Sequence, residues 1–207
     1  QIEKLKASVS AAAFASRGDL VIITTFTFLW AFQAGVDAGL TPGAATSKAG
    51  MIFGIAQGMA LLWSPVMGMI LDRIPRLTGV CVAFGLAGIG YSALGQVADP
   101  FGPWMLPAAM LAGVGEASAV VAAGVLIGQE APAATRGTLI GVFGLCGSLG
   151  IVCLTFAGGL VFDGFGRSAP FVMMGIVNFA VLAAALRVRR MQLQAGPAGD
   201  ACTSAGA

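Results

Sequence analysis

The chain has 207 residues, of which 57% are hydrophobic and only 10% are charged, and its mean hydropathy is +0.91. A soluble domain is usually about a quarter charged, so this composition excludes an ordinary water-soluble fold. It also excludes a disordered chain, and the net charge of +2 gives no sign of a nucleic-acid-binding surface. The long unbroken apolar runs favour membrane helices over the short alternating strands of a membrane barrel, so we expect an all-α membrane protein.

Six apolar runs are long enough to cross a bilayer, whose hydrocarbon core of about 30 Å needs roughly 20 helical residues. They cover residues 20–36, 50–71, 77–97, 104–127, 138–162 and 169–186. Turn-forming residues separate them, as in Thr41-Pro42-Gly43 and the Pro-rich segment 99–103. Because the connections are short, consecutive helices should be antiparallel neighbours. The sequence predicts a six-helix transmembrane bundle over residues 20–190.

The segments that flank the predicted bundle are more polar. Residues 1–19 read as a cytoplasmic lead-in or linker, either a frayed tail or a short amphipathic helix on the membrane surface, because apolar residues recur there at helical spacing. The apolar positions are Ile2, Leu5, Val9 and Ala12, and Glu3, Lys4 and Lys6 lie on the other side. Residues 191–207 are small, polar and Gly-rich, which predicts a disordered cytoplasmic tail.

The distribution of basic residues predicts the orientation. With six spans both termini lie on one side of the membrane, and that side collects nine of the eleven Lys and Arg residues. Lys48 and Arg167 alone fall on the other side. Because basic loops stay in the cytoplasm, we expect both termini to be cytoplasmic, in a bacterial inner (plasma) membrane.

Small residues recur every four positions on two of the predicted helices. The sets are Gly50, Gly54 and Gly58, then Ser64 and Gly68, and finally Gly137 and Gly141. This spacing lets helix backbones approach closely in lipid, so it predicts tight helix contacts, either static or sliding.

The loop after the second span reads Gly68-Met69-Ile70-Leu71-Asp72-Arg73-Ile74-Pro75-Arg76. It resembles the signature of the major facilitator superfamily, in which a Gly is followed four residues later by Asp-Arg and then by further basic residues. Pro75 and Leu77 depart from that pattern, since a Gly and a second basic residue are usual there. The loop from Glu130 to Arg136-Gly137 and the turn with Gly158-Gly159, Asp163 and Pro170-Phe171 are similar to the same family.

The resemblance implies one six-helix half of a twelve-helix transporter that works by alternating access. The lead-in and the loose tail favour the C-terminal half, whereas the loop signature is more typical of N-terminal halves. It further implies a cytoplasmic gate of charged residues that pair and separate during the cycle. The expected gate residues are Gly68, Asp72, Arg73, Arg76, Glu130 and Arg136.

Glu116 is the most informative single residue, because it lies twelve residues after Trp104 and eleven before Ile127, near the middle of a span. A charged carboxylate at that depth costs about 2.5–3.5 kcal/mol on insertion scales, so Glu116 must face water, pair with a partner or hold a proton. It is a candidate for proton coupling or substrate contact, or else a structural acid that fixes helix packing. Gln57 and Gln33 are the other polar candidates, because an unpaired amide in a span is costly.

The sequence therefore predicts a secondary transporter half that moves a small-molecule substrate, with protons as the candidate coupling ion. Its partners would be the lipid bilayer and a second six-helix half, in the same polypeptide or another chain, and neither a cofactor nor a metal is indicated. The alternative is a non-transporting assembly factor or receptor of the same fold. An enzyme is not expected, since His is absent and only one acid is predicted to be deep in the membrane.

Overall fold

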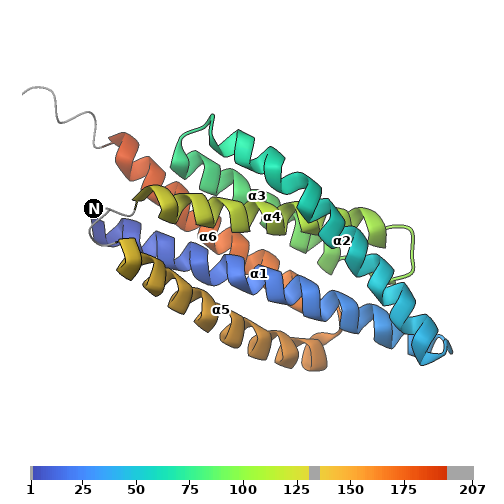
Figure 1. The fold of residues 1–207 in the computed structure, drawn as a ribbon. Helices are drawn as coiled ribbons and strands as arrows, with labels where there is room; N and C mark the ends of the chain where they lie inside the picture. The colour runs from blue at the N-terminus through green and yellow to red at the C-terminus, as the bar shows by residue number, and fades with distance from the viewer. Residues whose placement is uncertain (1, 131–135, 195–207) are drawn as a thin grey trace, which may run out of the picture.

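The computed structural model describes the backbone of residues 2–130 and 136–194, and it describes the side chains of residues 10–125, 137–138 and 140–191. Six α-helices make up the described chain (Figure 1). They are α1 (Ile2–Asp37), α2 (Pro42–Leu71), α3 (Arg76–Gly95), α4 (Met105–Glu130), α5 (Arg136–Phe165) and α6 (Ala169–Gln194).

All six predicted spans are confirmed as helices long and apolar enough to cross a membrane. The second begins earlier than predicted, at Pro42, because Pro is well tolerated in a first helical turn and the Thr41 hydroxyl caps the helix by accepting from the Ala44 N–H at 3.4 Å. The last continues to Gln194, beyond the predicted start of the tail at residue 191. Residues 195–207, where the rest of the predicted tail falls, lie outside the described residues.

The first helix differs most from the sequence-based expectation. Helix α1 runs without a break from Ile2 to Asp37, and its part with described side chains, Ser10–Asp37, is long and apolar enough to cross a membrane. Residues 2–19 of the predicted lead-in are therefore helical and continuous with the first span, and Asp19 lies near the middle of this helix.

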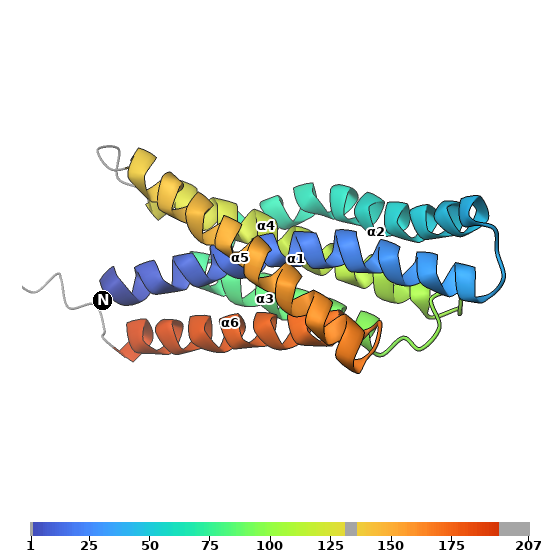
Figure 2. The same ribbon diagram turned by 90° about the horizontal axis from the view of Figure 1, so that it is seen from below.

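The helices run along one common axis and alternate in direction (Figures 1 and 2). Helix α1 begins and α6 ends at the same end of the bundle, together with the α2–α3 connection, and we call this the N-terminal end. The connections α1–α2, α3–α4 and α5–α6 lie at the opposite end. Helix α4 packs against α2 and α3, α3 also packs against α6, and α1 packs against α5.

Burial differs sharply between the helices. In the apolar 18-residue stretch of each helix, 67% of α4 and 56% of α3 are buried inside the bundle, against 22% of α2 and 17% of α5. Because α5 is also among the most apolar helices, with a mean hydropathy of 2.1, its exposed side chains suit lipid or another apolar surface.

The tight glycine contacts occur on other positions than predicted. A Cβ added at Gly50, Gly54, Gly58, Gly68, Gly137 or Gly141 would meet no atom of the described residues within 4 Å. In contrast, a Cβ at Gly115 would lie 2.6 Å from the Ala87 Cα of α3, and one at Gly113 would clash with the Ala56 carbonyl of α2. Among the described residues, helices thus approach closely at glycines other than the predicted ones, including those of α4 and Gly150 of α5, while the predicted stripe on α2 and the predicted pair Gly137 and Gly141 are open.

Candidate functional site

Glu116 and Gln57, two of the residues singled out in the sequence, meet inside the bundle. The Gln57 Nε2 donates a hydrogen bond to Glu116 Oε2 at 2.9 Å, which links α2 to α4. Glu116 is only 3% exposed, and Gln57 is half-buried. Of the three surroundings that the sequence allowed for Glu116, the structure therefore shows a paired carboxyl rather than one that faces open water.

Two further features hold α2 and α4 together around this pair. Gly113 and Gly115 lie one turn or less before Glu116, and their missing side chains let α4 approach the backbones of α2 and α3. The Trp63 Nε1 donates to Ser118 Oγ at 2.9 Å, while the Ser118 hydroxyl donates to the Val114 carbonyl at 2.7 Å. The Glu116 carboxyl is thus positioned by a rigid helix contact.

Gln33 does not join this pair. It is half-buried near the end of α1, four residues before the helix ends at Asp37, and it makes no hydrogen bond with the described part of the chain. Trp30, three residues earlier, is 3% exposed and packs against Phe171 of α6 with ring centroids 5.9 Å apart. Trp30 therefore packs in the interior of the bundle.

A second buried acid, which the sequence analysis did not single out, lies on α1. Asp19 is fully buried, and its Oδ1 accepts from the Asn178 Nδ2 of α6 at 2.7 Å. The Tyr91 hydroxyl of α3 donates to the Asp19 backbone carbonyl at 2.7 Å. Three helices, α1, α3 and α6, therefore meet at Asp19, and we call this group the Asp19 cluster (Asp19, Tyr91 and Asn178).

The prediction of a single deep acid was therefore wrong. Arg17 and Asp19 together resembled the polar edge of a span, so the predicted boundary fell after them. The signal in the sequence was the apolar run 11–15 before Arg17, which extends the span if one exposed Arg is accepted inside it. Arg17 is exposed, while Asp19, two residues later on the helix, turns toward the bundle interior.

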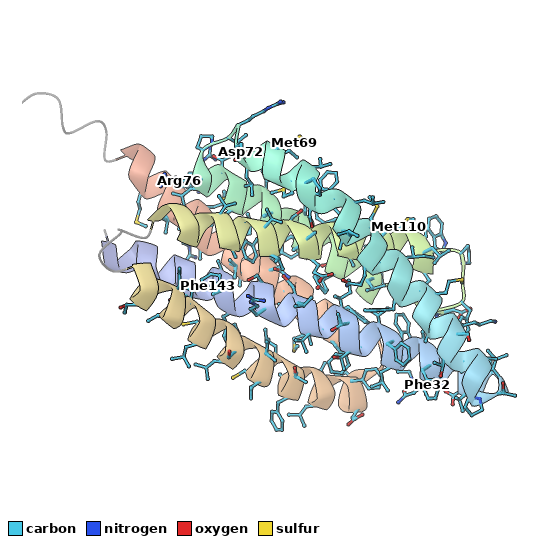
Figure 3. The ribbon with its side chains drawn as sticks, viewed as in Figure 1. Phe32, Met69, Asp72, Arg76, Met110 and Phe143 are labelled. Atoms are coloured by element: carbon cyan, nitrogen blue, oxygen red, sulfur yellow. The ribbon has the colours of Figure 1, made fainter. Side chains whose placement is uncertain are left out.

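The predicted gate residues lie at the N-terminal end of the bundle. Figure 3 shows Asp72 and Arg76 there, at the α2–α3 connection, while Phe32 lies at the opposite end. Asp72, Arg73 and Arg76 are exposed, and the Asp72 N–H caps α2 by donating to the Gly68 carbonyl at 3.1 Å. Glu130 ends α4 and Arg136 begins α5, but their side chains lie outside the described residues.

The two basic residues predicted for the other side are at the opposite end, and both are engaged. Arg167 forms an ion pair with Asp37, with 2.6 Å between the guanidinium nitrogen and Oδ2. The Lys48 ammonium lies over the Phe101 ring, 4.8 Å from its centroid. These contacts tie α1 to the α5–α6 turn and α2 to the α3–α4 connection. Beside the first of them, Trp30, Asp99 and Arg167 line a cavity of about 470 Å³.

Comparisons with known proteins place this geometry in a family. The chain is 35% identical over 167 residues to the magnetosome protein MamZ of Paramagnetospirillum magneticum, which covers 80% of this chain and 26% of that protein. It is 28% identical over 198 residues to the magnetosome protein MamH of the same organism, which covers 96% of this chain and 46% of that protein. The chain thus spans less than half the length of either relative.

Two solved structures share the fold. The xylose transporter XylE from E. coli, in an inward-open conformation, superposes with a TM-score of 0.73 at 17% identity, over 94% of this chain and 51% of that one. The POT family transporter PepTSo also gives a TM-score of 0.73, at 15% identity, over 92% of this chain and 37% of that one. The sequence pattern of the Major Facilitator Superfamily matches residues 9–200. The chain therefore belongs to the Major Facilitator Superfamily and forms one six-helix unit of its fold.

Proposed function

We propose that the chain is half of a secondary transporter that moves a small solute across a membrane by alternating access. The observation that carries this proposal is the buried Glu116–Gln57 pair, halfway along α4 and joined across two helices. A buried acid inside a membrane bundle is costly, and such acids are characteristic of solute and ion paths. The family membership and the six-helix unit support the same function.

A second six-helix half completes the transporter in this proposal. The exposed faces of α2 and α5 carry open glycines and large apolar side chains, among them Leu61 and Phe156, which are 74% and 70% exposed. Small residues favour close helix contacts in lipid, so these faces suit helices of the other half. A purified monomer of these 207 residues should therefore not transport. Net flux by such a monomer would contradict this part of the proposal.

The charged loop supplies the gate on the cytoplasmic side. Asp72, Arg73 and Arg76 lie together at the N-terminal end, far along α2 from Gln57. We place this end in the cytoplasm, because basic residues concentrate there and basic loops stay inside. Glu130 and Arg136 would join the cluster from the α4–α5 connection. Protease accessibility of the α2–α3 loop in sealed inside-out vesicles tests the orientation.

Proton coupling is assigned to Glu116 in this proposal. Its carboxyl is buried and has an amide partner instead of a basic one, so the charged form lacks a counterion there. A proton taken up from one side and released to the other would drive the solute with it. Glu116→Gln should abolish accumulation against a gradient and leave exchange, because exchange needs no net proton movement.

An accessibility experiment tests alternating access without knowing the substrate. In a functional variant of the whole protein without native cysteines, Gln57→Cys is exposed to a membrane-impermeant thiol reagent from either side. Alternating access predicts labelling from both sides, because the middle of the bundle opens to each in turn. Ile176→Cys on α6 is the control, since Ile176 is 64% exposed on an apolar helix face and should react from neither side.

The second candidate is a magnetosome protein that does not transport, such as an assembly factor or receptor. The names of the relatives favour it, because both are magnetosome proteins. Labelling of Gln57→Cys from one side only, or from neither, would support this candidate and contradict alternating access.

A further inference from the structure

The Asp19 cluster contains two buried acceptors that no described group satisfies. Asp19 Oδ2 and Asn178 Oδ1 both lack a hydrogen-bond partner, although the two side chains are already joined through Asp19 Oδ1 and Asn178 Nδ2. Both residues are 0% exposed. An unsatisfied buried polar group costs about 1–3 kcal/mol, and here two lie on neighbouring side chains.

The orientation of the Asn178 amide cannot simply be reversed to remove this conflict. Its Nδ2 also donates to the Met174 backbone carbonyl at 3.0 Å, and a carbonyl can only accept. The nitrogen must therefore face both Met174 and Asp19 Oδ1. The amide oxygen, Asn178 Oδ1, then has no hydrogen-bond donor, because an ionised Asp19 carboxylate can only accept.

We propose that Asp19 and Asn178 form a proton-binding site, in which one proton on Asp19 Oδ2 is donated to Asn178 Oδ1. That single proton removes both unsatisfied acceptors and closes a carboxyl–amide pair with two hydrogen bonds. It also avoids an ionised carboxylate in a fully buried position. The site lies on α1 and α6, so loss of the proton leaves two facing acceptors and weakens the contact between these helices.

The charged surroundings agree with this assignment. Tyr91 from α3 and Glu116 from α4 are the titratable groups that act electrostatically on Asp19, and neither can supply a positive charge. In the described chain, α2, α5 and α6 bring no titratable group to it. Arg17 on α1 itself is exposed, and its aliphatic part lies over Gly147 of α5. The inference goes beyond the proposed transport and does not depend on it.

Infrared spectroscopy on the whole protein in lipid nanodiscs tests the site. In a Glu116→Gln background, which removes the other buried acid, the spectrum before and after Asp19→Asn is compared at neutral pH. We expect the difference to contain the carbonyl band of a protonated carboxylic acid. A difference that contains only the bands of an ionised carboxylate would overturn the proposal.

A second infrared measurement uses Asn178→Leu, which removes the amide partner and keeps Asp19. If Asn178 is the partner, this variant retains the acid band but shifts it, because the carboxyl loses its hydrogen bonds. An unshifted band would show that the two side chains do not share the proton. The measurements are repeated in sodium and in choline buffer, since a small cation also needs oxygen ligands. Disappearance of the acid band in sodium alone would show a cation site and contradict the proton assignment.

Asp19→Asn also gives a stability test. An amide at position 19 places N–H where the protonated carboxyl has O–H, so it mimics the proton-bound pair. The parent protein should lose thermal stability as pH rises, because the folded state holds a proton that the unfolded carboxyl releases. Asp19→Asn should lose that part of the pH dependence and keep its stability. An unchanged pH dependence in Asp19→Asn would count against the site.

Discussion

Helices α4 and α2 differ in what their glycines do. On α4, Gly113 and Gly115 have backbone atoms of neighbouring helices in the space where a side chain would be. On α2, Gly50, Gly54 and Gly58 face open space, although their spacing looks like a packing motif. The comparison teaches that a small residue every four positions marks a face available for close contact, but only the fold decides whether that contact is made within this unit.

Alanine substitutions at these glycines test the difference between α4 and α2, and we expect them to have the largest effect on stability. Gly113→Ala places a methyl group against the Ala56 carbonyl, and a backbone atom can move away only with its helix. We expect a loss of about 1–3 kcal/mol in the free energy of unfolding, which is typical of overpacking. Thermal unfolding of the 207-residue unit in detergent measures it. Gly58→Ala is the matched control and should be neutral or stabilising by roughly 0.5–1 kcal/mol, because its Cβ meets no atom within this unit and Ala favours helix. Equal losses in both variants would mean that the α2 stripe is as tightly covered as α4.

The Glu116–Gln57 hydrogen bond allows a second test of this comparison, because it joins the largely buried helix α4 to the more exposed helix α2. Gln57→Leu leaves the Glu116 carboxyl buried without its donor, so we expect a loss of about 1–3 kcal/mol in stability. Glu116→Gln is the matched variant and should fold nearly as well as the parent, because an amide oxygen still accepts from Gln57. Chemical unfolding of the two variants side by side makes the test. If Glu116→Gln is the less stable of the two, the carboxyl has a packing role that the amide cannot fill.

The gate residues should show a smaller effect, and on rate rather than on stability. Arg73→Ala and Asp72→Asn change exposed charges at the end of α2, where surface ion pairs contribute about 0.2–1 kcal/mol. We expect turnover to slow by a few-fold, with substrate binding nearly unchanged, because only contacts that differ between states shift the cycle. Exchange rates and binding measured on the same preparations would check it. Normal turnover with lost binding would show that the loop is not a gate.

The ion pair at the opposite end should have the smallest effect. Asp37 and Arg167 are 60% and 39% exposed, so solvent screens their attraction. Arg167→Ala should therefore change stability by less than about 1 kcal/mol, and the change should shrink further in high salt. Lys48→Ala serves as the companion variant, since Lys48 contacts Phe101 at the same end without an ion pair. A large effect of Arg167→Ala that persists in high salt would contradict this and would indicate that Arg167 is buried in another conformation of the protein.

Much of the site could be read from the sequence, but not its partners. Glu116 and Gln57 were singled out because each is a costly polar group within an apolar span, and depth along a span follows from counting residues. Which of the two glutamines meets Glu116 depends on how α2, α1 and α4 pack. Gln33 looked equivalent in the sequence, yet it lies near the C-terminal end of α1 and stays apart.

The Asp19 cluster could not be predicted from the sequence. Hydropathy placed Asp19 at a membrane edge because Arg17 and Asp19 are both polar, and periodicity alone does not say that a helix buries one and exposes the other. Tyr91 and Asn178, on α3 and α6, are distant in sequence from Asp19 and from each other. Their convergence depends on how α1, α3 and α6 are arranged in the bundle.

The sequence by itself determined six membrane helices, their alternating directions and the end at which the charged loop lies. These follow from local chemistry, since a bilayer demands about 20 apolar residues per helix and short connections force neighbours to be antiparallel. The tertiary structure alone decided which glycines are packed, which amide meets Glu116 and that a second acid is buried. Those outcomes depend on contacts between residues far apart in the chain, because a helix presents many faces and only packing against a specific neighbour selects the buried one.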